Sequence, residues 1–184
     1  MMKMENEINV NVPLEVVKAS EIEPKEVKWL WYPYIPFGKV TLLQGDPGDG
    51  KSKLMLSIAA LLSKGEPLPF TETEEIESMT IIYQTTEDDA DDTVVPRFNS
   101  AGGNGENLIF IKEDEKSLSF GDNRIAEAIE RYHAKLLILD PMSSYIGENC
   151  SMNNANETRA EFNHLISVAK NTGCAIVIIA HTCV

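Results

Sequence analysis

The octapeptide GDPGDGKS at residues 45–52 has the residue types and the spacing that bind a polyphosphate. It matches the phosphate-binding pattern, in which a glycine is followed, after four residues, by Gly-Lys-Ser. Glycines let the backbone turn its N–H groups closely around phosphate oxygens, the lysine neutralises their charge, and the serine ligates Mg²⁺. We therefore expect nucleotide phosphates to be bound by Gly45, Asp46, Pro47, Gly48, Asp49, Gly50, Lys51 and Ser52.

An aspartate that can complete a magnesium site follows a second apolar run, residues 136–139. If that run is a buried parallel strand, Asp140 lies at its carboxyl edge, where such sheets bind ligands. A carboxylate there can hold the Mg²⁺ water shell. The alternative is that Asp140 is simply a turn former before Pro141. Together with the loop, the magnesium role is favoured, so we expect Ser52 and Asp140 to be the metal ligands.

Hydrolysis of a bound nucleotide also requires a group that orients or deprotonates the attacking water. Glu87 ends the stretch IIYQTTE that begins at Ile81, and it can emerge on the same sheet edge as the loop. The alternative is that Glu87 is one more member of an exposed acidic helix start, which describes its neighbours Asp88 and Asp89 well. We predict Glu87 to be the catalytic carboxylate, with Lys51 assisting on the phosphates.

His181 follows the last apolar run, residues 177–180, and ends it on the same expected edge. A polar residue there can contact the γ-phosphate and respond to its loss. A histidine at a strand end can equally be an ordinary surface residue. We include His181 among the candidate catalytic residues.

Strand-length apolar runs alternate with helical patterns from residue 39 onward. The runs are continuous rather than alternating, as a parallel sheet covered on both faces requires, so we expect an α/β fold with a mostly parallel sheet between helices. Strands are expected at 39–44, 79–85, 108–111, 136–139 and 175–180. Helices are expected at 51–63 with Gly65 as the stop, at 93–100, after the cap Asp122, and in a segment ending at Gly173. Two helix faces follow the helical period: Ile125, Ala128, Ile129 and Tyr132; and Phe162, Leu165, Ile166 and Ala169.

The composition of the 184-residue chain, 43% apolar and 24% charged, is that of an ordinary globular domain. A formal net charge of −13 excludes duplex DNA binding by a broad basic face. No apolar run approaches the roughly 20 residues of a membrane span, and the N-terminus lacks a secretory apolar stretch. We therefore expect a cytoplasmic protein without a membrane partner, with free thiols at Cys150, Cys174 and Cys183.

Residues 1–27 are polar and acidic, which predicts a flexible N-terminal arm ahead of one folded core at 28–184. The aromatic segment 29–36 carries too much apolar surface to remain in water. We expect it to pack on the domain or on a neighbouring subunit. A platform on which bases stack is the alternative.

The order of these motifs resembles the RecA-like P-loop ATPases, and specifically the RepA-type hexameric replicative helicase group of plasmids, phages and mobile elements. The resemblance covers about residues 21–182. It is carried by the loop and by the stretches WLWYPYIPFGKVTLLQGDPGDGKS, TTEDDADD, DDTVVPRFNSAGG, LLILDP, DPMSSYIGEN and IIAHT.

This resemblance implies Mg-dependent ATP hydrolysis in DNA replication, with Lys51 and Ser52 on the phosphates and Mg²⁺. It also implies Glu87 as the catalytic carboxylate, Asp140 as the Walker B acid and His181 as the polar sensor. The complete protein is then expected to form a homo-oligomeric ring, a hexamer, around single-stranded DNA. Members of the group continue into further strands, so we expect a core truncated at its C-terminus, an uncovered sheet edge at strand 175–180, and weak ATPase activity.

Two other functions remain open at this point. A P-loop kinase would transfer the γ-phosphate to a small acceptor, but the arginines Arg97, Arg124, Arg131 and Arg159 do not form the cluster expected of a kinase lid. A non-catalytic nucleotide-binding assembly module is the second alternative.

Overall fold

A computed structural model of the protein describes residues 14–71, 76–113, 115–146 and 155–182. Its centre is a five-stranded sheet with the strand order β3-β7-β6-β4-β5. All of its pairings are parallel. The strands are β3 (Val40–Gly45), β4 (Ile81–Thr85), β5 (Leu108–Ile109), β6 (Leu136–Asp140) and β7 (Ala175–His181). The predicted α/β fold with a mostly parallel sheet is confirmed.

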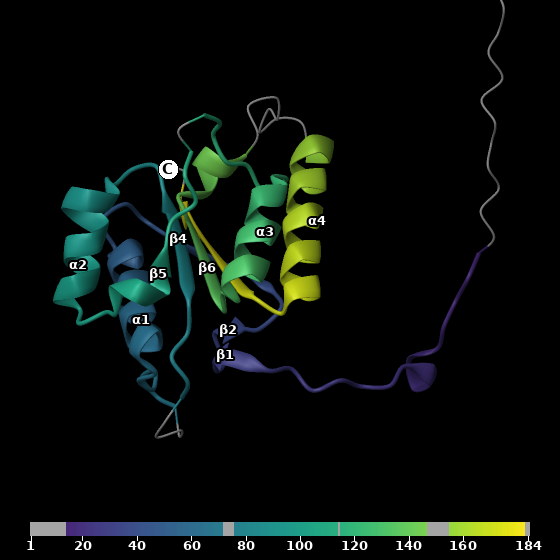
Figure 1. Ribbon diagram of the computed structural model, residues 1–184. Helices are drawn as coiled ribbons and strands as arrows, with labels where there is room; N and C mark the ends of the chain where they lie inside the picture. The colour runs from purple at the N-terminus through teal and green to yellow at the C-terminus, as the bar shows by residue number, and fades with distance from the viewer. Residues whose placement is uncertain (1–13, 72–75, 114, 147–154, 183–184) are drawn as a thin grey trace, which may run out of the picture.

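Helices cover both faces of this sheet (Figure 1). One face carries α1 (Lys51–Lys64) and α2 (Val95–Ser100), and the other carries α3 (Asn123–Tyr132) and α4 (Ala155–Thr172). Because successive strand residues point to opposite faces, Ile81 and Tyr83 join the core under α1, while Ile82 joins the core under α3 and α4. Both faces are buried, which explains why the strand sequences are apolar without alternation.

The expected helix ends are present where the backbone needs them. Gly65 ends α1 in the left-handed conformation, with φ 76°. Its backbone N–H donates to the Leu61 and Leu62 carbonyls. The side chain of Asp122 caps α3 by accepting the Arg124 N–H at 2.9 Å. These two ends fix where α1 and α3 stop and start against the sheet.

Three details differ from the expectations. Tyr132 and Ile166 belong to the two expected periodic helix faces, but each is 48% exposed, because the buried part of each face is narrower and centres on Ile129 in α3 and on Leu165 in α4. The segment expected to be helical from residue 93 is preceded by a π-helical turn, Ala90–Val94, that runs into α2. The strands expected from 79 and up to 111 are shorter, since β4 begins at Ile81 and β5 ends at Ile109.

The strand at 175–180 does not lie at a sheet edge, so that prediction is wrong. β7 is hydrogen-bonded to β3 on one side and to β6 on the other. Consecutive parallel strands are joined by crossovers rather than hairpins, which allows the last described strand to lie between two earlier ones. On that side of the sheet it is β3, the strand before the phosphate-binding loop, that has only one partner among the described strands.

A short antiparallel ribbon, β1 (Trp29–Trp31) with β2 (Ile35–Pro36), anchors the aromatic segment to the domain. Leu30 and Ile35 are buried in it, and the Trp31 indole N–H donates to the Pro69 carbonyl at 2.8 Å. These residues therefore pack on their own domain, one of the two expected modes, while Tyr32 and Tyr34 remain 66% and 56% exposed. The role of the aromatic segment in base stacking is untested.

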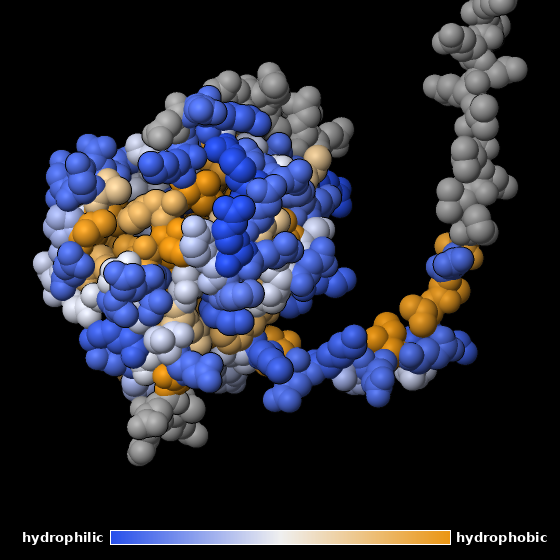
Figure 2. Space-filling view, in the orientation of Figure 1, coloured by the Kyte–Doolittle hydropathy of each residue, from blue (hydrophilic) through white to orange (hydrophobic). Residues whose placement is uncertain are grey.

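The residues before this ribbon, 14–28, extend from the domain and contain a 3-10 turn, Ala19–Glu21 (Figure 1). Hydrophobic side chains along them are exposed (Figure 2), including Leu14 and Val16. Expectations for residues 1–13 and for Cys150 and Cys183 fall outside the described residues. Cys174 is a buried free thiol, and none of the described helices is long and apolar enough to cross a membrane.

Candidate nucleotide site

The phosphate-binding loop connects the end of β3 directly to the first turn of α1. Gly48 and Gly50 adopt φ values of 90° and 78°, a region that side chains other than glycine rarely occupy. Gly50 is also the N-cap of α1, so the unpaired N–H groups of the first helical turn face the loop. This arrangement is an anion site made of backbone dipoles.

Lys51 is held inside this loop. Its ammonium donates to the Gly45 carbonyl at 2.9 Å and to the Asp46 carbonyl at 2.7 Å, and the residue is only 7% exposed. The Asp49 carboxylate closes the other side of the loop by accepting the Asp46 N–H at 2.8 Å. The cation is therefore already positioned within the loop that would surround the phosphates.

Asp140 ends β6 as a buried carboxylate, 3% exposed. The Tyr83 phenol from β4 donates to its Oδ2 atom at 3.0 Å, while its Oδ1 atom has no hydrogen-bond partner among the described residues. Burial raises the pKa of the Asp140 carboxyl, and the neighbouring Ser52 and Tyr83 hydroxyls act in the opposite direction. Burial and the Asp140 carboxylate raise the pKa of Tyr83, so this phenol stays protonated and donates.

These residues fit Mg²⁺. A buried carboxylate with an unpartnered oxygen needs a nearby cation or donor, and the Ser52 hydroxyl lies beside it. In the part of the chain that the structure describes, no group of three His, Cys, Asp or Glu side chains could hold a metal ion. Mg²⁺ does not need one, because it is commonly held by one or two carboxylates, waters and substrate phosphates.

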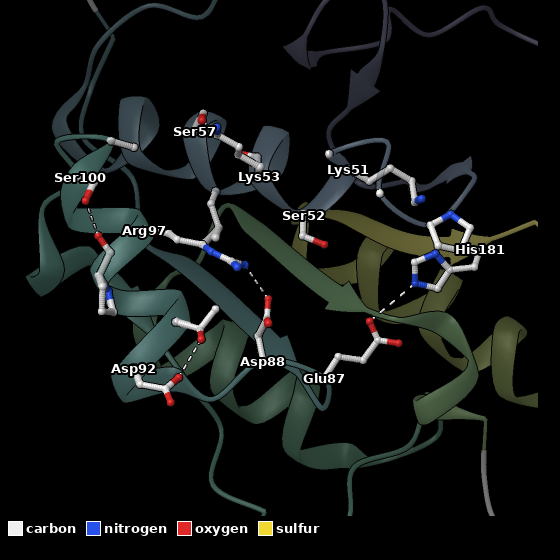
Figure 3. Close-up of a pocket in the computed structure, with 17 residues that line it drawn as sticks. Lys51, Ser52, Lys53, Ser57, Glu87, Asp88, Asp92, Arg97, Ser100 and His181 are labelled. Carbon is white, nitrogen blue, oxygen red and sulfur yellow. Dashed lines mark hydrogen bonds and ion pairs between the residues drawn. The ribbon is translucent and has the colours of Figure 1, made fainter.

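Glu87 and His181 face each other across the mouth of the site (Figure 3). Glu87 Oε2 lies 3.6 Å from His181 Nε2, with the Glu87 side chain 58% exposed. The Thr85 hydroxyl organises the end of β4 by accepting the N–H groups of Glu87 at 3.2 Å and Asp88 at 3.3 Å. On the β7 side, the Thr182 N–H donates to the Gly45 carbonyl and the Thr182 hydroxyl bonds to Asp46, so the loop and the strand end are joined.

A groove of about 1150 Å³ unites most of the predicted residues. It is lined by loop residues together with Glu87 and His181, and it extends between α1 and α2. Asp140 is too deeply buried to line the groove, but its carboxyl lies next to Ser52 of the loop. The structure therefore brings together every residue that the sequence nominated, at the carboxyl ends of β3, β4, β6 and β7.

A comparison with protein-family models identifies the family. The model described as an AAA domain matches residues 8–183, nearly the whole chain. The chain belongs to the AAA domain family. This membership, with the intact phosphate-binding loop, supports a P-loop ATPase that binds and hydrolyses nucleotide. A search of the curated proteins finds no match.

The AAA domain also presents residues that the sequence reasoning did not nominate. Arg97 of α2 lines the groove, with its guanidinium 2.8 Å from the Asp88 carboxylate (Figure 3). Lys53 lines the same groove one residue beyond the motif. Tyr83 bonds to Asp140 from the neighbouring strand. The sequence signal for Tyr83 was weak, because β4 also contains the polar residues Gln84 and Thr85, and Arg97 had none until α2 was placed beside α1.

Proposed function

We propose that this AAA domain binds Mg·ATP in the groove and hydrolyses it to ADP and phosphate. The observation that carries the proposal is that site residues from four strands meet at one sheet edge. The loop after β3, Glu87 after β4, Asp140 at the end of β6 and His181 at the end of β7 come from four strands and meet at one sheet edge. This is the edge at which open parallel sheets bind ligands.

In the proposed complex, the loop N–H groups and the Lys51 ammonium bind the β- and γ-phosphates. Lys51 exchanges its present bonds to the Gly45 and Asp46 carbonyls for phosphate oxygens. Ser52 and Asp140 hold Mg²⁺, which supplies neutralisation of phosphate charge. Burial of Lys51 and Asp140 strengthens both interactions, since charges attract more strongly away from water.

Glu87 orients the attacking water and accepts its proton as the water oxygen bonds to the γ-phosphorus. The bond from the γ-phosphorus to the bridging oxygen breaks, and its electron pair leaves with ADP. His181, at 3.6 Å from Glu87, lies where it can contact the γ-phosphate and the catalytic carboxylate together. Its proposed role is to sense the loss of that phosphate.

At the level of the whole protein, we propose that this ATPase drives a RepA-like replicative helicase in the cytoplasm. The core at 28–184, preceded by the arm at 1–27, would work in a homo-oligomeric ring, a hexamer, on single-stranded DNA. The motif order from residue 21 to residue 182 and the AAA family match support this proposal. The net charge of −13 favours local contacts with a single strand over a broad duplex-binding face.

Phosphate release from ATP tests the proposal, with Glu87→Gln as the decisive variant. The amide keeps the shape of the side chain but loses the proton acceptor, so turnover is expected to fall by about 100-fold or more. Nucleotide affinity measured by calorimetry should be unchanged, because Glu87 acts on the water rather than on the phosphates.

Asp89→Asn is the matched control, since Asp89 is exposed in the same acidic run and does not line the groove. A loss of turnover in Asp89→Asn equal to that in Glu87→Gln would show that the acidic run acts through its overall field. Asp88 is a poor control because it pairs with Arg97. Transfer of phosphate to an added small acceptor in place of release would instead favour a kinase, and acceleration by single-stranded DNA supports the helicase role.

A further inference from the structure

The carboxylate of the proposed magnesium site accepts a hydrogen bond from a tyrosine hydroxyl on the neighbouring strand β4. Tyr83 is the third residue of β4, paired in register with Ile138 of β6, and it is 1% exposed. Its hydroxyl donates to Asp140 Oδ2 at 3.0 Å, while the buried Asp140 Oδ1 has no partner in the part of the chain that the structure describes. One carboxylate oxygen is therefore fixed by a hydrogen bond, and the other can accept a further ligand.

A tyrosine hydroxyl at this depth is costly unless it is hydrogen-bonded, so the burial of Tyr83 in β4 needs a reason. The bond to Oδ2 supplies one, because a terminal carboxylate rotates easily about its last torsion. One fixed oxygen removes that freedom. Removing a group that hydrogen-bonds to a metal-binding side chain commonly lowers the affinity for the metal.

We propose that Tyr83 is a positioning residue for the magnesium site: its hydroxyl holds Asp140 Oδ2, so that Oδ1 remains available to the Mg²⁺ of a bound nucleotide. This inference rests on the proposed function, since it concerns the same site. Tyr83 is not a catalytic residue, because it reaches the nucleotide only through Asp140. Tyr83 should therefore affect the affinity for Mg·nucleotide rather than the rate of the chemical step.

The test is Tyr83→Phe, and Tyr145→Phe is its matched control. Tyr145 is also a fully buried tyrosine, but its hydroxyl has no hydrogen-bond partner in the described structure. ADP binding is measured by calorimetry across a range of Mg²⁺ concentrations and again in EDTA. ADP avoids any contribution from turnover.

In Tyr83→Phe, the Mg²⁺ concentration required for half of the maximal gain in ADP affinity should rise by about tenfold. Its affinity for ADP in EDTA should equal that of the wild-type chain, because the loop and Lys51 are untouched. Tyr145→Phe should match the wild-type chain in both measurements. In an Asp140→Asn background, Tyr83→Phe should have no further effect on the Mg²⁺ requirement, as expected if Tyr83 acts through Asp140.

An unchanged Mg²⁺ requirement in Tyr83→Phe would overturn the proposal, and so would an equal loss in Tyr145→Phe. Failure of Tyr83→Phe to melt cooperatively in EDTA would also contradict it, because the hydroxyl would then be needed for the fold itself. A wild-type chain whose ADP affinity does not respond to Mg²⁺ would instead contradict the proposed function. The two failures are therefore distinguishable.

Discussion

Individual site residues were predictable from the sequence to the extent that their roles depend on short spacing or on a strand end. The loop from Gly45 to Ser52 is contiguous, so the sequence contains its whole geometry. Glu87, Asp140 and His181 each follow a predicted strand, and a parallel sheet brings such ends to one edge. Tyr83 and Arg97 could not be found this way. Their contacts depend on strand register and on the placement of α2, which no local pattern encodes.

The Thr85 hydroxyl is expected to control where Glu87 lies, since it accepts the N–H groups of both Glu87 and Asp88. Thr85→Val keeps the branched shape and removes these bonds, so kcat should fall by about tenfold, the equivalent of one or two hydrogen bonds. The KM for ATP should change little, because the phosphate contacts lie in the loop. Steady-state phosphate release gives both constants.

Thr85→Ser keeps the hydroxyl and should retain most of the activity. A Thr85→Ser chain as slow as Thr85→Val would show that the methyl group, rather than the hydroxyl, positions the strand end.

At the scale of helices and strands, the sequence predicted most elements, because their apolar periods and end signals are local. Gly65 and Asp122 mark real helix ends. The π-helical turn Ala90–Val94 was missed, since an acidic run carries no period that distinguishes it from an ordinary helix start. Tyr132 and Ile166 are half exposed because periodicity identifies an apolar face, whereas tertiary packing decides how much of that face is covered.

The cap of α3 gives a stability prediction with a pH dependence. Asp122 bonds to the backbone and the guanidinium of Arg124, and this hydrogen-bonded cation lowers the pKa of the Asp122 carboxyl. Asp122→Ala should lower the free energy of unfolding by about 1 kcal/mol at pH 7. Urea unfolding followed by circular dichroism measures the difference.

The sign of the pH effect follows from the direction of the shift. Since the folded pKa lies below the unfolded value, the charge-dependent part of this stabilisation is complete above about pH 4 and is lost as the pH falls through the folded pKa. The gap between wild type and Asp122→Ala should therefore narrow in acid. Asp122→Asn keeps a capping oxygen and should be the milder variant at pH 7. A gap that widens in acid would refute this account of the cap.

At the scale of the whole molecule, strand order was the feature that the sequence could not give. A parallel sheet joins its strands by crossovers, so the position of β7 between β3 and β6 depends on long-range packing. That order has a functional consequence. It places His181 beside Gly45 in register, which brings the last described strand end to the first phosphate-binding residue. Local patterns predicted the members of the site, and the order of the strands determines that they meet.

The central claim is that the loop, with Lys51 as its cation, binds the phosphates of a Mg·nucleotide. Calorimetric titration of the chain with Mg·ADP tests it most directly, comparing wild type with Lys51→Ala and with Lys53→Ala. Lys53 lines the same groove but is exposed, whereas Lys51 is buried among loop carbonyls. Removing a buried hydrogen-bonded charge costs about 2 kcal/mol or more, so Lys51→Ala should bind at least about 30-fold more weakly, with at most a few-fold effect in Lys53→Ala. Equal affinity in wild type and Lys51→Ala, with both chains melting cooperatively, would contradict the account.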